Sequence, residues 1–368
     1  MPDVPDPAVV HLRPAQFGEA ETVLATCGGL TASTFRYPSG VAALRIENRD
    51  GHIVVLPFQG QQIWDAVFRG RRLTMGSMFE EPLPTRNYLA TYGAFFLHCG
   101  ATAMGNPGPE DRHPLHGELP NAPYRRVWLA VGRDGDGPFM EVGGAYRHVV
   151  AFTHGYEAQP RVKLGAAGGR VRLTMCIDNL RRAPMELMYL AHINFRPVDG
   201  ARLIDTVPDD PRHMRVRTSV PAGLALSPAH RRLLEAVGAD PALHRAIEPG
   251  RAIDPELVLA LDCRADAAGW AHAMQLHPDG SADFVSHRPD ELGCAVRWIS
   301  RTGDEEALGL MLPATAEADG YTAEKAKGNL RVLPPLGRFT CTVAFGALDA
   351  DEAAALRQRI ETVMDGGA

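Results

Sequence analysis

The stretch Met185-Glu-Leu-Met-Tyr-Leu-Ala-His-Ile-Asn-Phe195 places a histidine and an asparagine, two residues apart, inside an apolar run. Side chains of a β-strand alternate between two faces, so this stretch predicts one apolar face and a second face that becomes polar toward its end. The second face carries Glu186, Met188, Leu190, His192 and Asn194. Buried polar groups are normally hydrogen-bonded, so His192 is either a satisfied core histidine or part of a functional site.

The composition is that of an ordinary globular protein, with 45% hydrophobic and 22% charged residues. A formal net charge of -6 and a pI of about 6.2 give the chain no basic field. Such a field would be expected if nucleic acid or an anionic membrane were the main partner. We therefore expect a small neutral or modestly charged ligand.

The N-terminal stretch carries acids and prolines where a signal peptide needs a basic start and an apolar core. No run approaches the ~18 apolar residues of a spanning helix. The six cysteines are scattered without C-x-x-C or zinc-type spacing, which favours reduced packing residues and a cytoplasmic location. Although 368 residues would also suit two domains, we find no clear linker and predict one domain over residues 1–368.

Most of the chain has the alternation and turn residues typical of antiparallel strands, with turns such as Asp50-Gly51 and Gly168-Gly169. We predict an all-β fold, a large antiparallel β-sandwich, because these strands follow one another at close spacing. The predicted strands are residues 41–47, 52–58, 61–68, 71–76, 124–132, 138–148, 149–153, 157–165, 170–178, 183–195, 201–207, 256–262, 270–277, 282–288, 292–300, 307–312 and 338–348.

Three segments interrupt the strand pattern. Residues 77–122 are rich in proline and glycine yet contain apolar runs, which predicts a folded insertion over one face of a sheet. Residues 227–248 have helical spacing. The C-terminal segment begins with a capping box, Asp349 and Glu352, followed by an apolar stripe, which predicts a packing helix.

The groups available for chemistry are histidines and carboxylates in four polar stretches, at residues 97–100, 115–123, 191–195 and 310–320. A nucleophile elbow, a P-loop and a dinucleotide-binding glycine motif are absent from plausible contexts. Histidine and carboxylate are the equipment of general acid–base catalysis, so we expect no organic cofactor.

Three motifs occur in a characteristic order: HG-x-x-x-N-x-P at residues 116–123, Tyr-x-x-His-Ile-Asn-Phe at residues 189–195, and Leu-Pro-Ala-Thr at residues 312–315. In this order the chain resembles the galactose mutarotase-like superfamily. Within it, the chain is most similar to the DUF4432 branch of aldose 1-epimerase-related proteins, over roughly residues 20–350.

The resemblance implies a β-supersandwich with a sugar-binding groove. It implies that His192 is the general acid on the ring oxygen and that His116 contacts the sugar. The family's base is a glutamate directly before a proline, but Leu312 precedes Pro313 here. Glu317 is the nearest substitute and Glu118 is another, although either could be a solvated loop acid.

We also expect Arg86, Asn87, His98 and Asn194 to contact the substrate. Arginine and amide side chains suit sugar hydroxyls, but Arg86 and Asn87 could equally be ordinary loop residues, and His98 could be a core histidine. His98, His116, His192 and Glu317 lack the close spacing of a metal motif, so no metal is predicted.

These residues favour a carbohydrate-active isomerase that interconverts sugar anomers or epimers. One alternative is a sugar-binding protein without catalysis, which Leu312 at the base position would explain. Another is an isomerase or lyase acting on a sugar acid. We expect a small sugar or sugar acid as partner, neither nucleic acid nor membrane, and allow for a homodimer.

Overall fold

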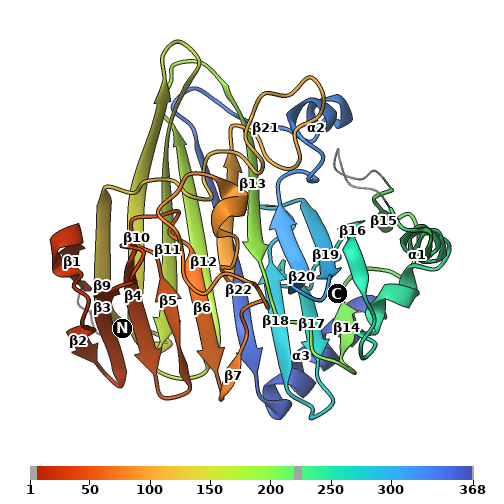
Figure 1. Cartoon of the computed structure of the whole chain (residues 1–368), viewed down its shortest axis with the longest axis horizontal. Helices are drawn as coiled ribbons and strands as arrows, with labels where there is room; N and C mark the ends of the chain where they lie inside the picture. Colours follow the sequence, from red (N-terminus) through yellow and green to blue (C-terminus); the bar gives the residue numbers. More distant parts are fainter. Residues whose placement is uncertain (1–5, 219–225, 367–368) are drawn as a thin grey trace.

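The computed structural model describes residues 6–218 and 226–366, which form two large antiparallel β-sheets (Figure 1). The sheets pack against each other through apolar side chains. Phe96 from the larger sheet, for example, stacks on Phe345 from the smaller one at 5.5 Å between ring centroids. The prediction of an all-β sandwich is confirmed, whereas the assignment to a single domain stays a prediction.

The smaller sheet has nine strands. Their spatial order is β1 (Ala8–Leu12), β9 (Arg126–Asp134), β10 (Gly137–Val150), β11 (His154–Gly165), β12 (Gly169–Asn179), β22 (Arg338–Leu348), β18 (Ala282–His287), β17 (Ala271–Leu276) and β14 (Arg202–Asp205).

The larger sheet has thirteen strands. Eleven follow one path: β15 (Met214–Val216), β16 (Ile253–Leu261), β19 (Cys294–Arg301), β20 (Glu306–Ala314), β13 (Met185–Ile193), β8 (Phe96–Ala101), β6 (Ile63–Phe68), β5 (Gly51–Val55), β4 (Ala42–Asn48), β3 (Leu30–Arg36) and β2 (Thr22–Cys27). The other two are short: β21 (Arg331–Leu333) pairs with β13, and β7 (Arg71–Arg72) pairs with β6.

Strand β13, the stretch quoted at the outset, lies inside the larger sheet between β8 and β20. Its predicted apolar face packs into the core, where Tyr189 lies against Phe339 of the smaller sheet. Its other face carries Leu190 and His192 and turns toward a cavity. The alternation predicted for this strand therefore separates the core from the cavity.

The structure corrects several local predictions. Residues 77–122 do not lie wholly over a sheet face, because Phe96–Ala101 form β8 inside the larger sheet. The strand predicted at 149–153 is the end of β10, which stops at Val150; Phe152 has a φ of 68° in the turn that follows. Strands β1, β2 and β3 were not predicted.

The C-terminal helix packs on the outer face of the smaller sheet, against Met274, Phe284 and Leu348. Residues 227–248 form α1 (Pro228–Ala239) and the 3-10 helix η3 (Pro241–Arg245), as expected from their spacing. The C-terminal helix α3 (Ala350–Met364) begins with the predicted capping box, in which Asp349 accepts from the Glu352 amide. The remaining helices are η1 (Pro14–Gln16), η2 (Tyr88–Thr91) and α2 (Tyr321–Lys327). Among the described helices, none combines the length and apolarity required to cross a bilayer.

Candidate functional site

A cavity of about 180 Å³ opens on the face of the larger sheet that carries Leu190 and His192. It is more than ten times the ~10–15 Å³ that one buried water requires. Its walls come from strands β13, β16, β19 and β20 together with residues of the 77–122 segment. The polar and aromatic side chains that line it are Tyr88, Tyr92, Asn106, His116, His192, Arg217, Glu256 and Trp298.

The orientation of His192 is set by Asn194. The His192 Nδ1 lies 2.7 Å from the Asn194 Oδ1, and the Asn194 Nδ2 donates to the Ala94 carbonyl at 3.0 Å. Because the amide nitrogen is committed to a carbonyl, its oxygen faces the ring and Nδ1 is the donor. Nε2 therefore remains as the ring nitrogen available to a ligand. Asn194 positions His192 rather than lining the cavity itself.

His116 packs edge-to-face against His192 in the cavity lining, with ring centroids 5.5 Å apart and planes at 87°. Its backbone has a φ of 58°. Gly117 follows at a φ of 79°, where an added Cβ would lie 2.3 Å from the Ala103 carbonyl oxygen. The His-Gly pair is thus required by a tight turn. The His116 Nδ1 is buried without a hydrogen-bond partner, which leaves unused hydrogen-bonding capacity in the cavity wall.

Glu118 fixes this turn to the end of β8. Its carboxylate accepts from the backbone amides of Ala101 and Thr102 at 3.2 and 3.1 Å, from the Thr102 hydroxyl at 2.9 Å and from the Tyr156 hydroxyl at 2.6 Å. Since four donors already occupy it and it does not line the cavity, Glu118 is a structural residue and not the base considered from the sequence.

Burial keeps both cavity histidines neutral at pH 7. Desolvation lowers the pKa of His192 to about 4, although the hydrogen bond with Asn194 acts in the opposite direction. Desolvation also lowers the pKa of His116, and the nearby His192 adds to this effect. The cavity consequently presents two neutral imidazoles.

Glu256 is the one carboxylate among the described residues that line the cavity. It begins the apolar part of β16, accepts from the Trp298 indole Nε1 at 2.7 Å and is hydrogen-bonded by the Arg217 guanidinium. The Trp298 ring packs against the His192 ring at 5.5 Å between centroids. Two donors therefore hold an acid beside the histidine pair, and the remaining lone pairs of Glu256 can accept further hydrogen bonds.

Three of the predicted substrate contacts lie outside the cavity. His98 is fully buried on the core face of β8, opposite Ala191, with its Nδ1 2.8 Å from the Tyr189 hydroxyl. Arg86 is exposed and donates to the carbonyls of Asn121 and Glu118 at 2.8 and 3.1 Å. Asn87 is exposed at the start of η2. None of the three belongs to the cavity lining.

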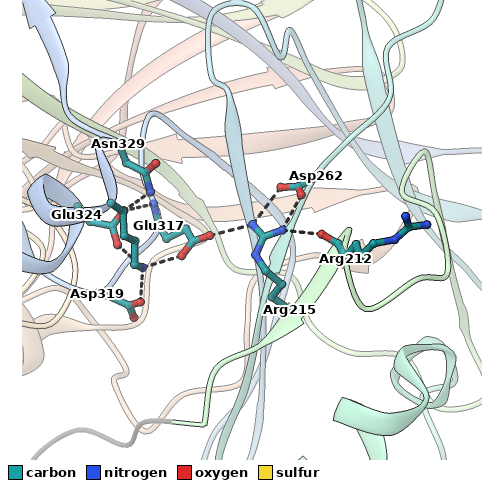
Figure 2. Close-up of polar contacts among 8 residues, drawn as sticks. Arg212, Arg215, Asp262, Glu317, Asp319, Glu324 and Asn329 are labelled. Atoms are coloured by element: carbon teal, nitrogen blue, oxygen red, sulfur yellow. Dashed lines mark hydrogen bonds and ion pairs between the residues drawn. The ribbon is translucent and has the colours of Figure 1, made fainter.

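The predicted base Glu317 also lies outside the cavity lining, in a network of ion pairs (Figure 2). It accepts from Arg215 at 2.9 Å and from Lys327 at 2.7 Å. Partial burial acts to raise its pKa, but the hydrogen bonds from Lys327 and Arg215 outweigh that effect and lower it. A carboxylate stabilised in its charged form by two cations is a poor proton acceptor, so the prediction for Glu317 is corrected.

Glu317, Asp319 and Glu324 lie close enough to hold a cation together. The ammonium of Lys327 is already bound by all three, at 2.7, 2.7 and 2.8 Å. This group, which we call the acidic cluster, is therefore charge-compensated by the chain itself.

Leu312, where the family resemblance led us to expect a glutamate, lines the cavity. Its partner across β19 is Val296, which also lines the cavity. The departure noted in the sequence thus falls inside the site.

Residues 38–207 match the family model described as "Domain of unknown function (DUF4432)". This match covers less than half of the chain, whereas the galactose mutarotase-like fold extends over nearly all of it. A search of curated sequences found no match to the chain.

Solved structures share this fold at low sequence identity. A Klebsiella pneumoniae protein described as a "putative aldose 1-epimerase" superposes with a TM-score of 0.81 at 16% identity, covering 97% of this chain and 96% of its own. A galactose mutarotase-like protein from Clostridium acetobutylicum gives 0.56 at 12% identity, with coverages of 94% and 99%. The galactose 1-epimerase of Lactobacillus acidophilus gives 0.50 at 12% identity, with coverages of 89% and 98%. At such identities the similarity establishes the fold.

Reasoning from the sequence missed most of the cavity wall: Tyr88, Tyr92, Arg217, Glu256 and Trp298. Glu256 precedes the apolar run of residues 257–261, and an acidic residue at that position is typical of the solvent-exposed end of a strand. Tyr88 and Tyr92 lie in a segment expected to be an insertion. One signal in the sequence could have identified the two tyrosines. They are four residues apart and lie in the same segment as the His116-Gly117 motif.

Proposed function

We propose that the protein is a carbohydrate-active isomerase of the aldose 1-epimerase type, which interconverts the anomers of a sugar. The observation that supports it is the pair of neutral imidazoles, in edge-to-face contact at 5.5 Å between centroids, in the lining of a cavity that also contains aromatic rings. Aromatic rings suit the apolar faces of a pyranose, and free ring nitrogens suit its hydroxyls.

The resting state of His192 points to a proton acceptor at Nε2 rather than to the acid implied by the family resemblance. In our proposal Nε2 takes the proton from the anomeric hydroxyl while the bond between C1 and the ring oxygen breaks. The resulting imidazolium gives that proton to the ring oxygen, which yields the open-chain aldehyde. Reversal on the other face of C1 gives the other anomer. One imidazole balances both proton transfers, so a carboxylate at position 312 is not needed.

The other cavity residues bind and orient the sugar in this scheme. His116 contributes its ring to the cavity lining and contacts the sugar there, and Glu256 accepts a hydroxyl with the lone pairs left by Trp298 and Arg217. Closely held donors and acceptors of this kind fix a substrate in the orientation that reacts.

The test is anomer exchange measured by NMR on freshly dissolved aldoses. We expect His192→Ala to lower the catalysed exchange rate by about 10²–10⁴-fold, the usual contribution of a general acid–base group. Glu317→Ala, outside the cavity, is the matched control and should retain activity. Equal exchange rates for wild type and His192→Ala, with both folded by circular dichroism, would exclude the proposed role.

A second candidate is a sugar-binding protein without catalysis, favoured by the presence of Leu312 in the cavity wall. It predicts binding by calorimetry without acceleration of exchange for any aldose. Turnover of a single sugar would rule it out. A sugar-acid substrate gains no support from Arg217, because that guanidinium already pairs with Glu256.

A further inference from the structure

The floor of the cavity is a continuous aliphatic surface built by four adjacent strands. Its members are Leu190 on β13, Leu312 on β20, Val296 on β19 and Val258 on β16. Val296 lies directly opposite Leu312, and Leu190 lies opposite Ala314, two residues from Leu312 on the same face. Each of the four is at most 8% exposed. We call this surface the aliphatic floor.

Polar groups lie directly beside the aliphatic floor, and Trp298 is the cross-strand partner of Val258. His192 follows Leu190 by two residues on β13, and Trp298 follows Val296 by two residues on β19. Much of the hydrogen-bonding capacity of His192 and Trp298 is already used within the protein. Asn194 holds one nitrogen of His192, and Glu256 holds the indole nitrogen of Trp298. The cavity can therefore satisfy hydroxyls at its border but not over the aliphatic floor.

The energetic consequence concerns which sugar edge can lie on the aliphatic floor. A hydroxyl buried there without a hydrogen-bond partner is disfavoured, whereas burial of a methyl group is favourable. Apolar pockets discriminate only moderately against an added hydroxyl, by about 10²-fold at most. The aliphatic floor should therefore favour a sugar that lacks a hydroxyl at one position.

We propose that the natural substrate is a deoxy sugar, with its methyl or methylene edge on the aliphatic floor and its hemiacetal at His192. This inference rests on the proposed isomerase function for the direction of the hemiacetal. The preference for a deoxy edge depends only on the cavity.

The experiment compares sugars that differ by one hydroxyl: D-fucose with D-galactose, 6-deoxy-D-glucose with D-glucose, L-rhamnose with L-mannose, and 2-deoxy-D-glucose with D-glucose. Exchange rates come from NMR and affinities from calorimetry. For at least one pair we expect the deoxy member to have a kcat/KM about 10–100 times higher. Equal or better use of the hydroxylated member in every pair would overturn the proposal.

Two variants test whether the aliphatic floor causes the preference. Val296→Thr places a hydroxyl in it at nearly constant volume, so the ratio within the preferred pair should fall toward one. If that variant does not fold, Val258→Thr, at the edge of the aliphatic floor, makes the same test. Val332→Thr, at a side chain that is 58% exposed, is the matched control and should leave the ratio unchanged. A ratio that is the same in the cavity variants and the control would contradict the proposal.

Failure of the proposed activity can be recognised separately. If no sugar undergoes catalysed exchange but calorimetry shows tighter binding of a deoxy member, the isomerase function is wrong and the deoxy preference stands. If catalysed exchange occurs without a deoxy preference, the isomerase function stands and the present inference is wrong. If no member of any pair binds, both are wrong.

Discussion

The cavity and the acidic cluster both gather ionisable side chains, but they differ in how completely those side chains are paired. In the acidic cluster, Glu317, Asp319 and Glu324 all accept from Lys327, and Arg215 adds a further hydrogen bond (Figure 2). In the cavity, His116 has a buried nitrogen without a partner and His192 keeps Nε2 free of protein partners. Ionisable groups whose hydrogen bonds are all made within the protein stabilise the fold, whereas groups with free hydrogen-bonding capacity beside a cavity are candidates for ligand binding.

Among the variants that compare the two regions, the largest expected effect follows from His116. Because Asn tolerates a positive φ better than most residues and keeps a polar side chain at this turn, His116→Asn should change the free energy of unfolding little. Anomer exchange should fall about 10²-fold, as for loss of a well-placed hydrogen-bonding group. Urea unfolding and NMR exchange on the same sample give both numbers. If the variant lost stability but kept its activity, His116 would be a structural residue and not part of the functional site.

The opposite pattern is expected for the acidic cluster. Lys327→Met leaves three carboxylates without their shared cation, one of them, Glu324, with a fully buried side chain. Breaking buried pairs costs about 3–5 kcal/mol, and partial exposure of Lys327 reduces this to roughly 2 kcal/mol. Activity should stay within about twofold.

The control for that variant is Lys325→Met, an exposed lysine on the same helix that pairs with Glu186. We expect it to leave the urea midpoint unchanged. If both lysine variants were equally stable, the acidic cluster would not be a stabilising element.

A matched pair of acids sharpens the comparison further. Glu256→Gln keeps the shape of the side chain but weakens charge-assisted hydrogen bonds to Arg217, Trp298 and the sugar. We expect kcat/KM to fall about tenfold, since a hydrogen bond to a charged group contributes about 1.5–3 kcal/mol and the amide retains part of it. Glu317→Gln should leave kcat/KM unchanged. Similar losses in both variants would mean that position relative to the cavity does not matter.

The smallest effect concerns pH. Since burial lowers the pKa of His192 to about 4, Nε2 stays unprotonated through the range in which an exposed histidine is charged. The acid limb of kcat/KM should therefore lie near pH 4 and not near 6.5. Rates measured between pH 3.5 and 8 in constant ionic strength test this, and a limb near 6.5 would show that the ring is solvated in the working enzyme.

Stability should respond to pH in two separate windows. In the unfolded chain His192 binds a proton below pH ~6.5, whereas in the folded chain it does so only below about pH 4. The free energy of unfolding therefore falls as the pH drops through this window. The lowered pKa of Glu317 contributes stability that is present above the unfolded value and is lost as pH falls through its folded value, below 4.5. Replacing His192 removes only its own share of the first effect, because burial also lowers the pKa values of His98, His244 and His287.

The sequence predicted the larger features because they depend on local patterns. The period-two alternation of residues 185–195 predicts which side of β13 is core, and the Asp349–Glu352 capping box predicts the start of α3. The family motifs also singled out His116 and His192, which both line the cavity. These signals are each contained within a few residues.

What the sequence could not predict depends on strand register and on packing between distant segments. His98 and His192 lie on neighbouring strands, but His98 pairs with Ala191 and therefore faces the core. Glu317 and Glu256 are both acids near apolar strands, and only the packing of β16 beside β19 brings Glu256 to the cavity. No local pattern distinguishes these cases.

The position of β22 has a consequence for how the chain reaches its fold. This strand joins β12 to β18 in the middle of the smaller sheet, yet it follows every other described strand in the sequence. Until residues 338–348 are available, one edge of β12 is unpaired, and pairing it closes a loop of well over a hundred residues. Slow, late completion of the sheet is expected for such non-local pairing. A nascent chain would therefore leave this edge of β12 unpaired while residues 180–337 are synthesised, and exposed strand edges of this kind favour aggregation.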